Sequence, residues 1–421
     1  MPLPLWVTFS NFRFSVDYLT QVKQELKERT PAQLTKRALK LFGAGDVEKA
    51  LTLLDKALLV YPRSVRLLDA RIAILREIKA YGRALPDLRA AVDRRRAKLK
   101  KKGYAIASKK DHLGREGRIL ISGFFYSGSG AVLDYLKGFE GVRKFPFVAG
   151  ESRVVKFPGG IAEMGKVVTV AGRLRSKEIV RFYLHLVGKQ IVQLARGLYH
   201  QDRIVNRNNR RLLKNKDSLG YFYQALQLLE DYWALAKKKK LSHDDFVTAS
   251  RAGLVRMLDA AALQNKVTKL VVDQIVTAWR IPIAQYMPPS SFIIVHRDPR
   301  DQYAEVKAAL SHPGRRVWSA AEFVKTIRDW RTRVDRHVAT LESKYGHRVL
   351  RVAFEDFVLD HEKESARVRD FVGLPLERMN EQRFFPEVSS ANVGKYASLL
   401  TPEEIRCIEA GLPEFLYRPR T

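Results

Sequence analysis

The feature that most constrains the fold is a short apolar run that ends in glycine and leads into a loop of glycine and serine. Residues 118–123 read Arg-Ile-Leu-Ile-Ser-Gly, a length and composition typical of a buried β-strand. Residues 124–130 read Phe-Phe-Tyr-Ser-Gly-Ser-Gly, and 131–136 have the apolar pattern of a helix start. The order strand, loop, helix predicts an α/β domain in which a mainly parallel sheet is flanked by helices.

The same loop has the composition of an anion-binding site. Glycines let the backbone approach a ligand closely, and the N-terminus of the following helix offers N–H groups and a positive dipole end. Serine hydroxyls can donate further hydrogen bonds. Turns of this kind are common in α/β proteins, so the loop is a candidate site only. Its residues are Tyr126, Ser127, Gly128, Ser129 and Gly130.

A second strand is predicted at residues 291–296, and it runs into Arg297-Asp298-Pro299-Arg300-Asp301 before a helix from Gln302. Arginines at a strand end can bind phosphate, each through two parallel hydrogen bonds. The alternative is a strand-to-helix turn held by salt bridges. We interpret His296, which ends the apolar strand, as a core histidine.

Together these segments resemble the sulfotransferases that use 3′-phosphoadenosine 5′-phosphosulfate (PAPS). Residues 123–130 are similar to the family's 5′-phosphosulfate loop, and 297–301 to its 3′-phosphate segment. Residues 350–357 resemble its late strand ending in Glu-Asp, and 392–396 its C-terminal segment. The four motifs stand in the family's order over about residues 115–420, and within the family the chain resembles bacterial enzymes that act on saccharides.

This resemblance implies a P-loop NTPase-like sulfotransferase fold and PAPS as co-substrate, without a metal. It implies that the loop residues from Tyr126 to Gly130 hold the 5′-phosphosulfate, while Arg297 and Lys395 hold the 3′-phosphate. The acceptor would be a hydroxyl or amine, on a saccharide or glycoconjugate. The sulfuryl group would move by in-line displacement, by analogy with phosphoryl transfer.

Two positions depart from the family pattern. Many members carry Lys or Arg where this chain has Tyr126, so another group must stabilise charge on the leaving oxygen, and Arg153 and Lys156 are candidates. Many members also carry serine where this chain has Glu305, and a carboxylate there would repel a phosphate. Either Glu305 points away, or the 3′-phosphate is held differently with help from Lys395.

The base that accepts the acceptor's proton has two candidates of equal standing. Asp273 ends a predicted strand, 270–273, that precedes the arginine motif, at a place where the family can carry its base, and Gln274 beside it is a positioning group. Glu151, next to Arg153, lies in a segment that continues into Pro158-Gly159-Gly160. A general base must satisfy geometry first and pKa second.

Small residues recur in the N-terminal part of the chain with a period of 34. Ala50 and Ala57 are matched by Ala84 and Ala91, and Pro62 ends the first unit. This spacing resembles the tetratricopeptide repeat, whose units are helix–turn–helix. We predict an all-α helical-repeat domain over 1–103, with a plain helical hairpin bundle as the alternative. The repeats would dock a protein partner or the acceptor.

The charge favours an anionic partner. The chain has 76 Lys and Arg against 45 Asp and Glu, a formal net charge of +31. We predict an α/β domain over 115–421 with a helical insertion around 167–269, whose basic clusters at 207–216 and 237–240 suit an acidic glycan. The basic run at 94–103 is interpreted as a solvated last helix turn and linker, with peripheral contact with an anionic membrane as the alternative. No nucleic-acid motif is present.

Other features suggest a cytoplasmic location. Cys407 is the single cysteine, so no intrachain disulfide can form. The chain lacks a signal-peptide pattern and an apolar run long enough to span a bilayer.

Two rival functions remain. A P-loop kinase would require lysine after the last glycine of the loop, and Ala131 stands there. A basic binding scaffold with a degenerate sulfotransferase domain is the non-catalytic alternative.

Overall fold

The structure is a computed structural model, and the chain divides into two compact units. One comprises residues 1–105, 166–214 and 225–242, and the other 106–165, 215–224 and 243–421. Helices α8 (Ile161–Ala171) and α11 (Leu219–Leu235) continue from one unit into the other. The structure describes residues 7–9, 12–14, 16–26, 29–106, 111–124, 126–145, 154–155, 159–188, 215–274, 276, 278–310 and 318–419.

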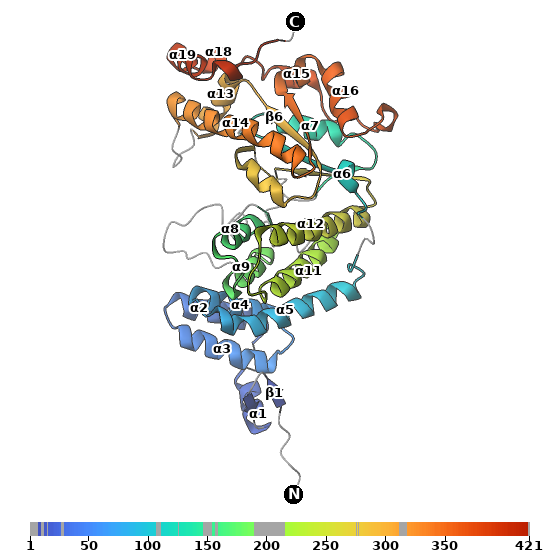
Figure 1. The fold of residues 1–421 in the computed structure, drawn as a ribbon. Helices are drawn as coiled ribbons and strands as arrows, with labels where there is room; N and C mark the ends of the chain where they lie inside the picture. Colours follow the sequence, from blue (N-terminus) through green and yellow to red (C-terminus); the bar gives the residue numbers. More distant parts are fainter. Residues whose placement is uncertain are drawn as a thin grey trace. The chain divides into compact units, whose positions relative to one another are not determined.

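The first unit is almost entirely helical (Figure 1). A small antiparallel hairpin, β1 (Val7–Phe9) and β2 (Phe12–Phe14), precedes α1 (Val16–Leu26). Two helix pairs follow, α2 (Pro31–Gly43) with α3 (Val47–Val60) and α4 (Val65–Glu77) with α5 (Tyr81–Lys101). The starts of α2 and α4 are 34 residues apart, and so are those of α3 and α5. A helical N-terminal region is confirmed, whereas its assignment to the tetratricopeptide family stays a prediction.

The small residues of the repeat are where helices pack. Ala50, Ala57, Ala84 and Ala91 are all completely buried. A short side chain at each position allows the neighbouring backbone to approach, so the period reflects packing and not chance composition.

Helix α9 (Ser176–Leu186) belongs to the same unit and packs against α4 and α5. The hydroxyl of Tyr183 donates to Asp69 Oδ1 at 2.6 Å, and Arg95 Nη2 donates to Asp69 Oδ2 at 2.7 Å. Burial, with the Asp69 charge second, raises the pKa of Tyr183 well above its usual value. Part of the stretch expected as an insertion of the α/β domain therefore packs with the N-terminal helices.

The second unit contains a five-stranded sheet in the order β4-β5-β3-β6-β7. All four strand pairs are parallel. This confirms the predicted fold class. The strands are β3 (Arg118–Gly123), β4 (Val142–Lys144), β5 (Lys269–Asp273), β6 (Ser291–His296) and β7 (Arg348–Ala353).

The central strand β3 is buried at all six positions, as expected for a parallel strand covered on both faces. Ile119, Ile121, Ile293 and Val295 form a core with α7 (Ser129–Leu136) and with the two helices that follow β7. Those helices are α15 (Phe354–Leu359) and α16 (His361–Phe371).

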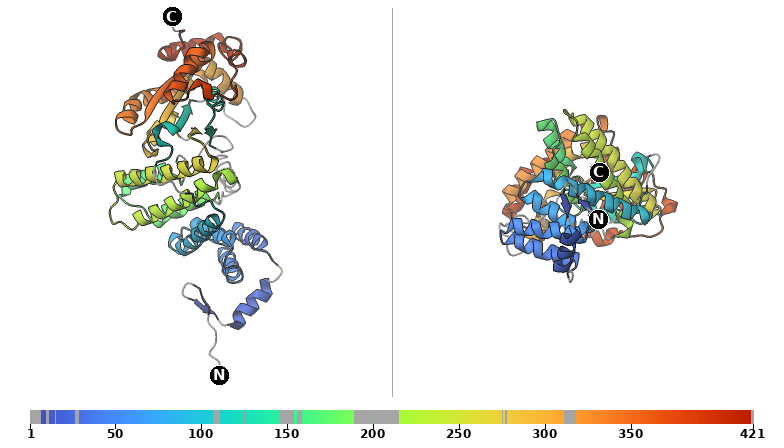
Figure 2. Two further views of the ribbon diagram at one scale, coloured as in Figure 1. Left: turned by 90° about the vertical axis from the view of Figure 1, so that its right-hand side faces the viewer. Right: turned by 90° about the horizontal axis from the view of Figure 1, so that it is seen from below.

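Helices cover both faces of the sheet (Figures 1 and 2). Side chains alternate along a strand, so the residues of β6 next to Val295 face the opposite side, where α14 (Ala320–Ser343) packs. The remaining helices of this unit are α6 (Gly114–Gly117), α12 (His243–Asn265), α13 (Pro299–Leu310), α17 (Pro386–Ser390), α18 (Tyr396–Leu399) and α19 (Pro402–Gly411). The 3₁₀ turns are η1 (Lys216–Ser218), η2 (Ala278–Tyr286), η3 (Leu376–Arg378) and η4 (Pro413–Phe415).

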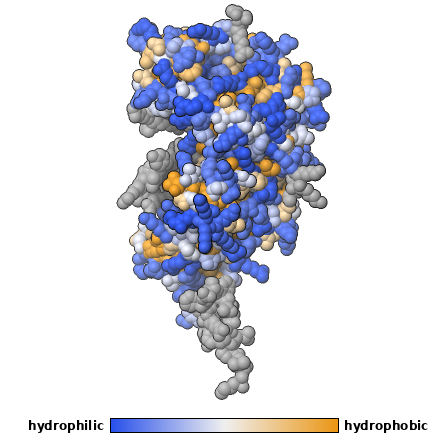
Figure 3. Space-filling model, in the orientation of Figure 1, coloured by the Kyte–Doolittle hydropathy of each residue, from blue (hydrophilic) through white to orange (hydrophobic). Residues whose placement is uncertain are grey.

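Hydrophilic side chains dominate the face of the molecule seen in Figure 3. Within the described ranges, no helix has both the length and the apolar character that crossing a membrane requires.

Candidate active site

The parallel sheet brings five chain segments to one edge. Because all strands run in one direction, their carboxyl ends meet at the same side of the sheet. β3 ends at Gly123, β4 at Lys144, β5 at Asp273, β6 at His296 and β7 at Ala353. The glycine-serine loop and the arginine motif are therefore neighbours, although more than 160 residues separate them in the sequence.

The loop after β3 has two glycines that no larger residue could replace without strain. A Cβ on Gly123 would lie 2.1 Å from Ser127 Oγ. Gly128 has a φ of +80°, and a Cβ there would lie 2.2 Å from a ring atom of Phe354. Tyr126 also adopts a left-handed conformation, with a φ of +51°, and its side chain is exposed. The chain is thus folded tightly on itself between strand and helix.

Ser127 is the most buried polar residue of this loop. Its side chain is 1% exposed, and its Oγ has no hydrogen-bond partner among the described residues. A buried hydroxyl without a partner costs free energy, so natural structures usually satisfy it with a ligand or water. Gly128 is the N-cap of α7, where N–H groups of the first turn point away from the helix. The loop can therefore receive an anion.

The end of β5 contacts the loop through Gln274. The Gln274 N–H donates to the Ile121 carbonyl at 2.8 Å, and its side-chain Nε2 donates to Ser129 Oγ at 3.0 Å. Gln274 has a φ of +55°, a conformation that non-glycine residues rarely adopt. Gln274 therefore contacts the loop from a strained backbone conformation.

Asp273 lies beside Gln274 and forms an ion pair with Lys144 at the end of β4, with 3.6 Å between Oδ2 and Nζ. Both side chains are partly exposed. Sequence analysis missed Lys144, because its strand has only three residues and no recognisable pattern. Lys144 lies close to Asp273 because β4 pairs with β5.

Arg297 reaches the glycine-serine loop from the end of β6. Its side chain is 4% exposed, and Nη1 donates to the Tyr126 carbonyl at 3.3 Å. Nη2 donates to the Asn392 carbonyl, and the guanidinium lies 5.0 Å from the ring centre of Phe354. The buried Nε has no hydrogen-bond partner in the described part of the chain. Arg297 thus joins three segments and retains a donor.

The second arginine of the motif has a structural role. Arg300 forms two hydrogen bonds with Asp298, at 3.0 and 2.8 Å, and one with Glu409 at 2.7 Å. Its guanidinium also lies 4.3 Å from the ring centre of Tyr396. The alternative interpretation of this segment, a strand-to-helix turn held by salt bridges, is therefore correct for Arg300. Arg297, by contrast, faces the candidate site.

Asp301 anchors the C-terminal motif 392–396. Its carboxylate accepts from the backbone N–H of Gly394 at 2.7 Å and from that of Tyr396 at 2.9 Å. Lys395, between them, donates to Asn392 Oδ1 at 3.1 Å. This segment is thereby held beside Arg297, which contacts the Asn392 carbonyl.

Glu305 points toward this group of cations and not away from it. Its Oε1 bonds with Lys395 Nζ and lies 3.8 Å from Arg297 Nη1. The carboxylate side chain is 28% exposed. Of the two alternatives for this position, an outward-facing carboxylate is therefore ruled out.

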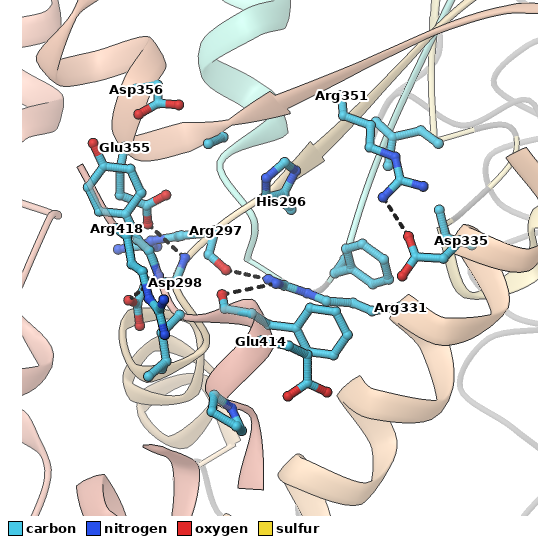
Figure 4. A pocket seen from close by; sticks show the side chains of 18 of the residues that line it. His296, Arg297, Asp298, Arg331, Asp335, Arg351, Glu355, Asp356, Glu414 and Arg418 are labelled. Atoms are coloured by element: carbon cyan, nitrogen blue, oxygen red, sulfur yellow. Dashed lines mark hydrogen bonds and ion pairs between the residues drawn. The ribbon is translucent and has the colours of Figure 1, made fainter. Parts of the chain in front are cut away.

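A cavity of about 970 Å³ lies behind the arginine motif (Figure 4). It is bounded by the ends of β6 and β7, by α14 and by residues 413–418. His296 lines this cavity and is only half-buried, which differs from the core histidine expected from the sequence.

Two buried ionisable groups of this cavity hold the backbone of the motif. Glu355 Oε1 accepts from the Asp298 N–H at 2.7 Å, and Arg331 donates to the carbonyls of Arg297 and Phe415. Burial raises the pKa of Glu355 to about 7 and lowers the pKa of Arg331 to about 10. Neither residue was selected from the sequence as a site residue, because their role depends on contacts with distant backbone.

The candidate base Glu151 and the candidate cations Arg153 and Lys156 lie outside the described residues. In the ranges that the structure describes, no group of three or more His, Cys, Asp or Glu side chains could hold a metal ion.

Comparison with known proteins gives a family match over one part of the chain. A sequence model of the sulfotransferase family matches residues 277–378, a segment that contains the arginine motif, Glu305, Arg331 and Glu355. No curated protein matches the chain significantly.

Several solved structures are similar to this chain. The sulfotransferase domain of the Synechococcus PCC 7002 olefin synthase is 18% identical, with a TM-score of 0.36, over 72% of this chain and 98% of that one. The sulfotransferase STF1 of Mycobacterium tuberculosis H37Rv is 13% identical with a TM-score of 0.36, over 96% and 98%. The sulfotransferase STF9 of Mycobacterium avium is 12% identical with a TM-score of 0.36, over 97% and 97%.

Proposed function

We propose that this protein is a PAPS-dependent sulfotransferase that acts on a hydroxyl or amine of a saccharide or glycoconjugate. The observation that carries the proposal is the contact between Arg297 and the carbonyl of Tyr126, which joins the two anion-binding motifs at one edge of the sheet. The family match over residues 277–378 supports sulfuryl transfer in general.

Residues of three segments would hold the donor. Ser127, whose buried hydroxyl has no partner among the residues that the structure describes, and the backbone N–H groups from Gly128 to Gly130 suit the 5′-phosphosulfate. Arg297 and Lys395 suit the 3′-phosphate. When bound, PAPS supplies an activated sulfuryl group whose bond to the phosphate oxygen breaks as the bond to the acceptor forms.

The chain's own residues would position the acceptor and move its proton. Asp273 is the proposed general base, at the carboxyl end of β5 and beside the Gln274–Ser129 contact. Lys144 forms an ion pair with that carboxylate and so helps to fix its position at the strand end. Glu151 remains the second candidate base, with Arg153 as a candidate for stabilising the leaving oxygen.

Charge supports an acidic acceptor. The net charge of +31 and the cluster Lys237–Lys240 favour glycans with carboxylate or sulfate groups. The N-terminal helices are proposed to dock a protein partner or the acceptor, and the basic end of α5 to contact anionic lipid. We propose a cytoplasmic location, and we do not expect nucleic acid as the partner.

The experiment that tests this function is calorimetric binding of 3′-phosphoadenosine 5′-phosphate (PAP), the desulfated product, beside ATP. We expect PAP to bind and Arg297→Ala to weaken its binding by about ten- to a hundredfold, the usual loss for a charged hydrogen bond. Arg406→Ala, which removes an exposed arginine paired with Glu403, is the matched control and should bind as the native protein does.

The other outcomes discriminate the alternatives. A preference for ATP would support a P-loop kinase, which the buried Ala131 at the expected lysine position argues against. Binding of neither nucleotide would leave the basic scaffold with a degenerate domain.

A further inference from the structure

The 3′-phosphate end of the proposed donor site contains an anion of its own. Glu305 lies on α13, two turns after Arg297, and its Oε1 contacts both cations assigned to the 3′-phosphate. Lys395 Nζ bonds with this oxygen directly, and Arg297 Nη1 lies 3.8 Å from it. The carboxylate is the third member of a charge cluster whose other members are both positive.

The geometry of Arg297 makes this position sensitive to charge. The guanidinium is 4% exposed, and its Nη1 and Nη2 donate to the carbonyls of Tyr126 and Asn392. Both acceptors are neutral carbonyl oxygens. Among the described residues, the ion pair of Arg297 is formed with the carboxylate of Glu305. Arg297 is buried while Glu305 and Lys395 are partly exposed, so water screens these charges less than it screens charges on the open surface.

From this arrangement we infer that Glu305 is an internal competitor of the donor's 3′-phosphate and thereby determines how strongly the site selects that group. This inference rests on the proposed function. With Glu305 in place, the charge that Arg297 and Lys395 present to a ligand is lower by one unit than it would be with a neutral residue at this position. An entering phosphate must separate Lys395 from Glu305 or accept a carboxylate beside it, and either requirement weakens binding.

The surrounding structure allows Glu305 to be replaced without loss of the site. Segment 392–396 is anchored by Asp301, through the N–H groups of Gly394 and Tyr396, and not by Glu305. Lys395 also keeps its hydrogen bond to Asn392 Oδ1. The variant should therefore retain both cations in place, and it should differ from the native protein in charge.

The experiment compares the native protein with Glu305→Gln and Glu305→Ser by calorimetry, using PAP and adenosine 5′-phosphate, which lacks the 3′-phosphate. We expect both variants to bind PAP about tenfold or more tightly, and adenosine 5′-phosphate within about twofold of the native value. Selectivity for the 3′-phosphate would rise accordingly. Glu403→Gln removes the same charge from an exposed ion pair and should change neither affinity.

The outcomes separate this inference from the function on which it rests. If the native protein binds PAP and both variants bind it equally or more weakly, Glu305 is not a competitor, while the sulfotransferase site stands. If PAP and adenosine 5′-phosphate tighten equally, Glu305 acts on the site as a whole and the selectivity role is wrong. If no form of the protein binds PAP, the proposed function fails and the inference with it. Melting curves without nucleotide identify a variant that has lost its fold. If one of the two Glu305 variants is unfolded, the binding measurements on the other variant test the inference.

Discussion

Glu355 in the first turn of α15, the helix that follows β7, accepts a hydrogen bond from the backbone N–H of Asp298, with 2.7 Å between Oε1 and N. The contact holds the arginine motif after β6 to the start of that helix (Figure 4). Glu355 is 1% exposed, and burial raises its pKa from 4.5 to about 7, with the nearby Asp298 charge adding to the effect and the hydrogen bond opposing it. The position of the motif is therefore coupled to the protonation of a buried carboxyl.

This coupling predicts that Glu355 makes the protein less stable as pH rises from about 4.5 to about 7. In that interval the folded state retains a proton that the unfolded state has released, so its stability declines with increasing pH. A pKa shift of this size corresponds to at most about 3 kcal/mol. Glu355→Gln keeps an acceptor for the Asp298 N–H and should abolish this part of the pH dependence.

Urea unfolding of both proteins at pH 5 and at pH 7.5 measures the effect. From pH 5 to pH 7.5, the free energy of unfolding should decrease more in the native protein than in the variant. Glu377→Gln, on the surface, is the control and should follow the native protein. Identical pH dependence in the native protein and Glu355→Gln would show that Glu355 is ionised in the fold throughout this range.

Gly128 is predicted to be indispensable, whereas Gly130 two positions later is not. Gly128→Ala places a Cβ 2.2 Å from the Phe354 ring at a φ of +80°, so we expect a loss of about 1–3 kcal/mol in unfolding free energy. Nothing lies within 4 Å of a Cβ on Gly130, and alanine suits a helix, so Gly130→Ala should be neutral or slightly stabilising. Thermal melting of the two variants provides the comparison, and equal losses would contradict the tight packing of the loop.

Asp301→Asn should loosen the C-terminal motif. The carboxylate accepts from two backbone N–H groups, through one oxygen each, whereas the amide has a single acceptor oxygen. We expect a loss of about 1–3 kcal/mol and faster amide hydrogen exchange over 392–396. Asp360→Asn, at an exposed position, is the control. If residues 392–396 of Asp301→Asn exchange their amide hydrogens as slowly as in the native protein, the anchoring role is disproved.

Gln274 combines a strained backbone with a contact to the loop, and two substitutions separate these effects. Gln274→Ala and Gln274→Gly both remove the amide that donates to Ser129, so both should weaken PAP binding. Glycine also relieves the left-handed φ of +55° and should be more stable than alanine by about 1 kcal/mol. Calorimetry measures the PAP binding of both variants, and melting curves compare their stabilities. An alanine variant at least as stable as the glycine variant would show that this backbone is not strained.

Local sequence patterns predicted the elements around the site. β3 and β6 were recognised because a buried parallel strand is a continuous apolar run, and the loop because glycine and serine stand between strand and helix. The arginine motif was found for the same reason, since its residues are adjacent in the chain. Such signals need no knowledge of distant contacts.

Other features could not be predicted, because they depend on which strands become neighbours. The two arginines of the motif look alike in sequence, yet Asp298 and Glu409 bind Arg300 while Arg297 reaches the loop. Likewise α9, expected as part of an insertion, packs with the N-terminal helices through the Tyr183–Asp69 hydrogen bond.

The sequence by itself determined the α/β class, the 34-residue helical period and the two candidate anion-binding motifs, since each rests on a pattern that is read directly along the chain. Tertiary structure decided what those motifs contact. The strand order β4-β5-β3-β6-β7 brought Gln274 to Ser129 and Lys144 to Asp273. The tertiary fold also directs the partly exposed Glu305 toward Lys395 and Arg297, where its carboxylate interacts with two cations. The physical reason is that the energies of charge interactions and hydrogen bonds depend on distances between atoms. For residues far apart in the sequence, those distances are set only once the strands have paired.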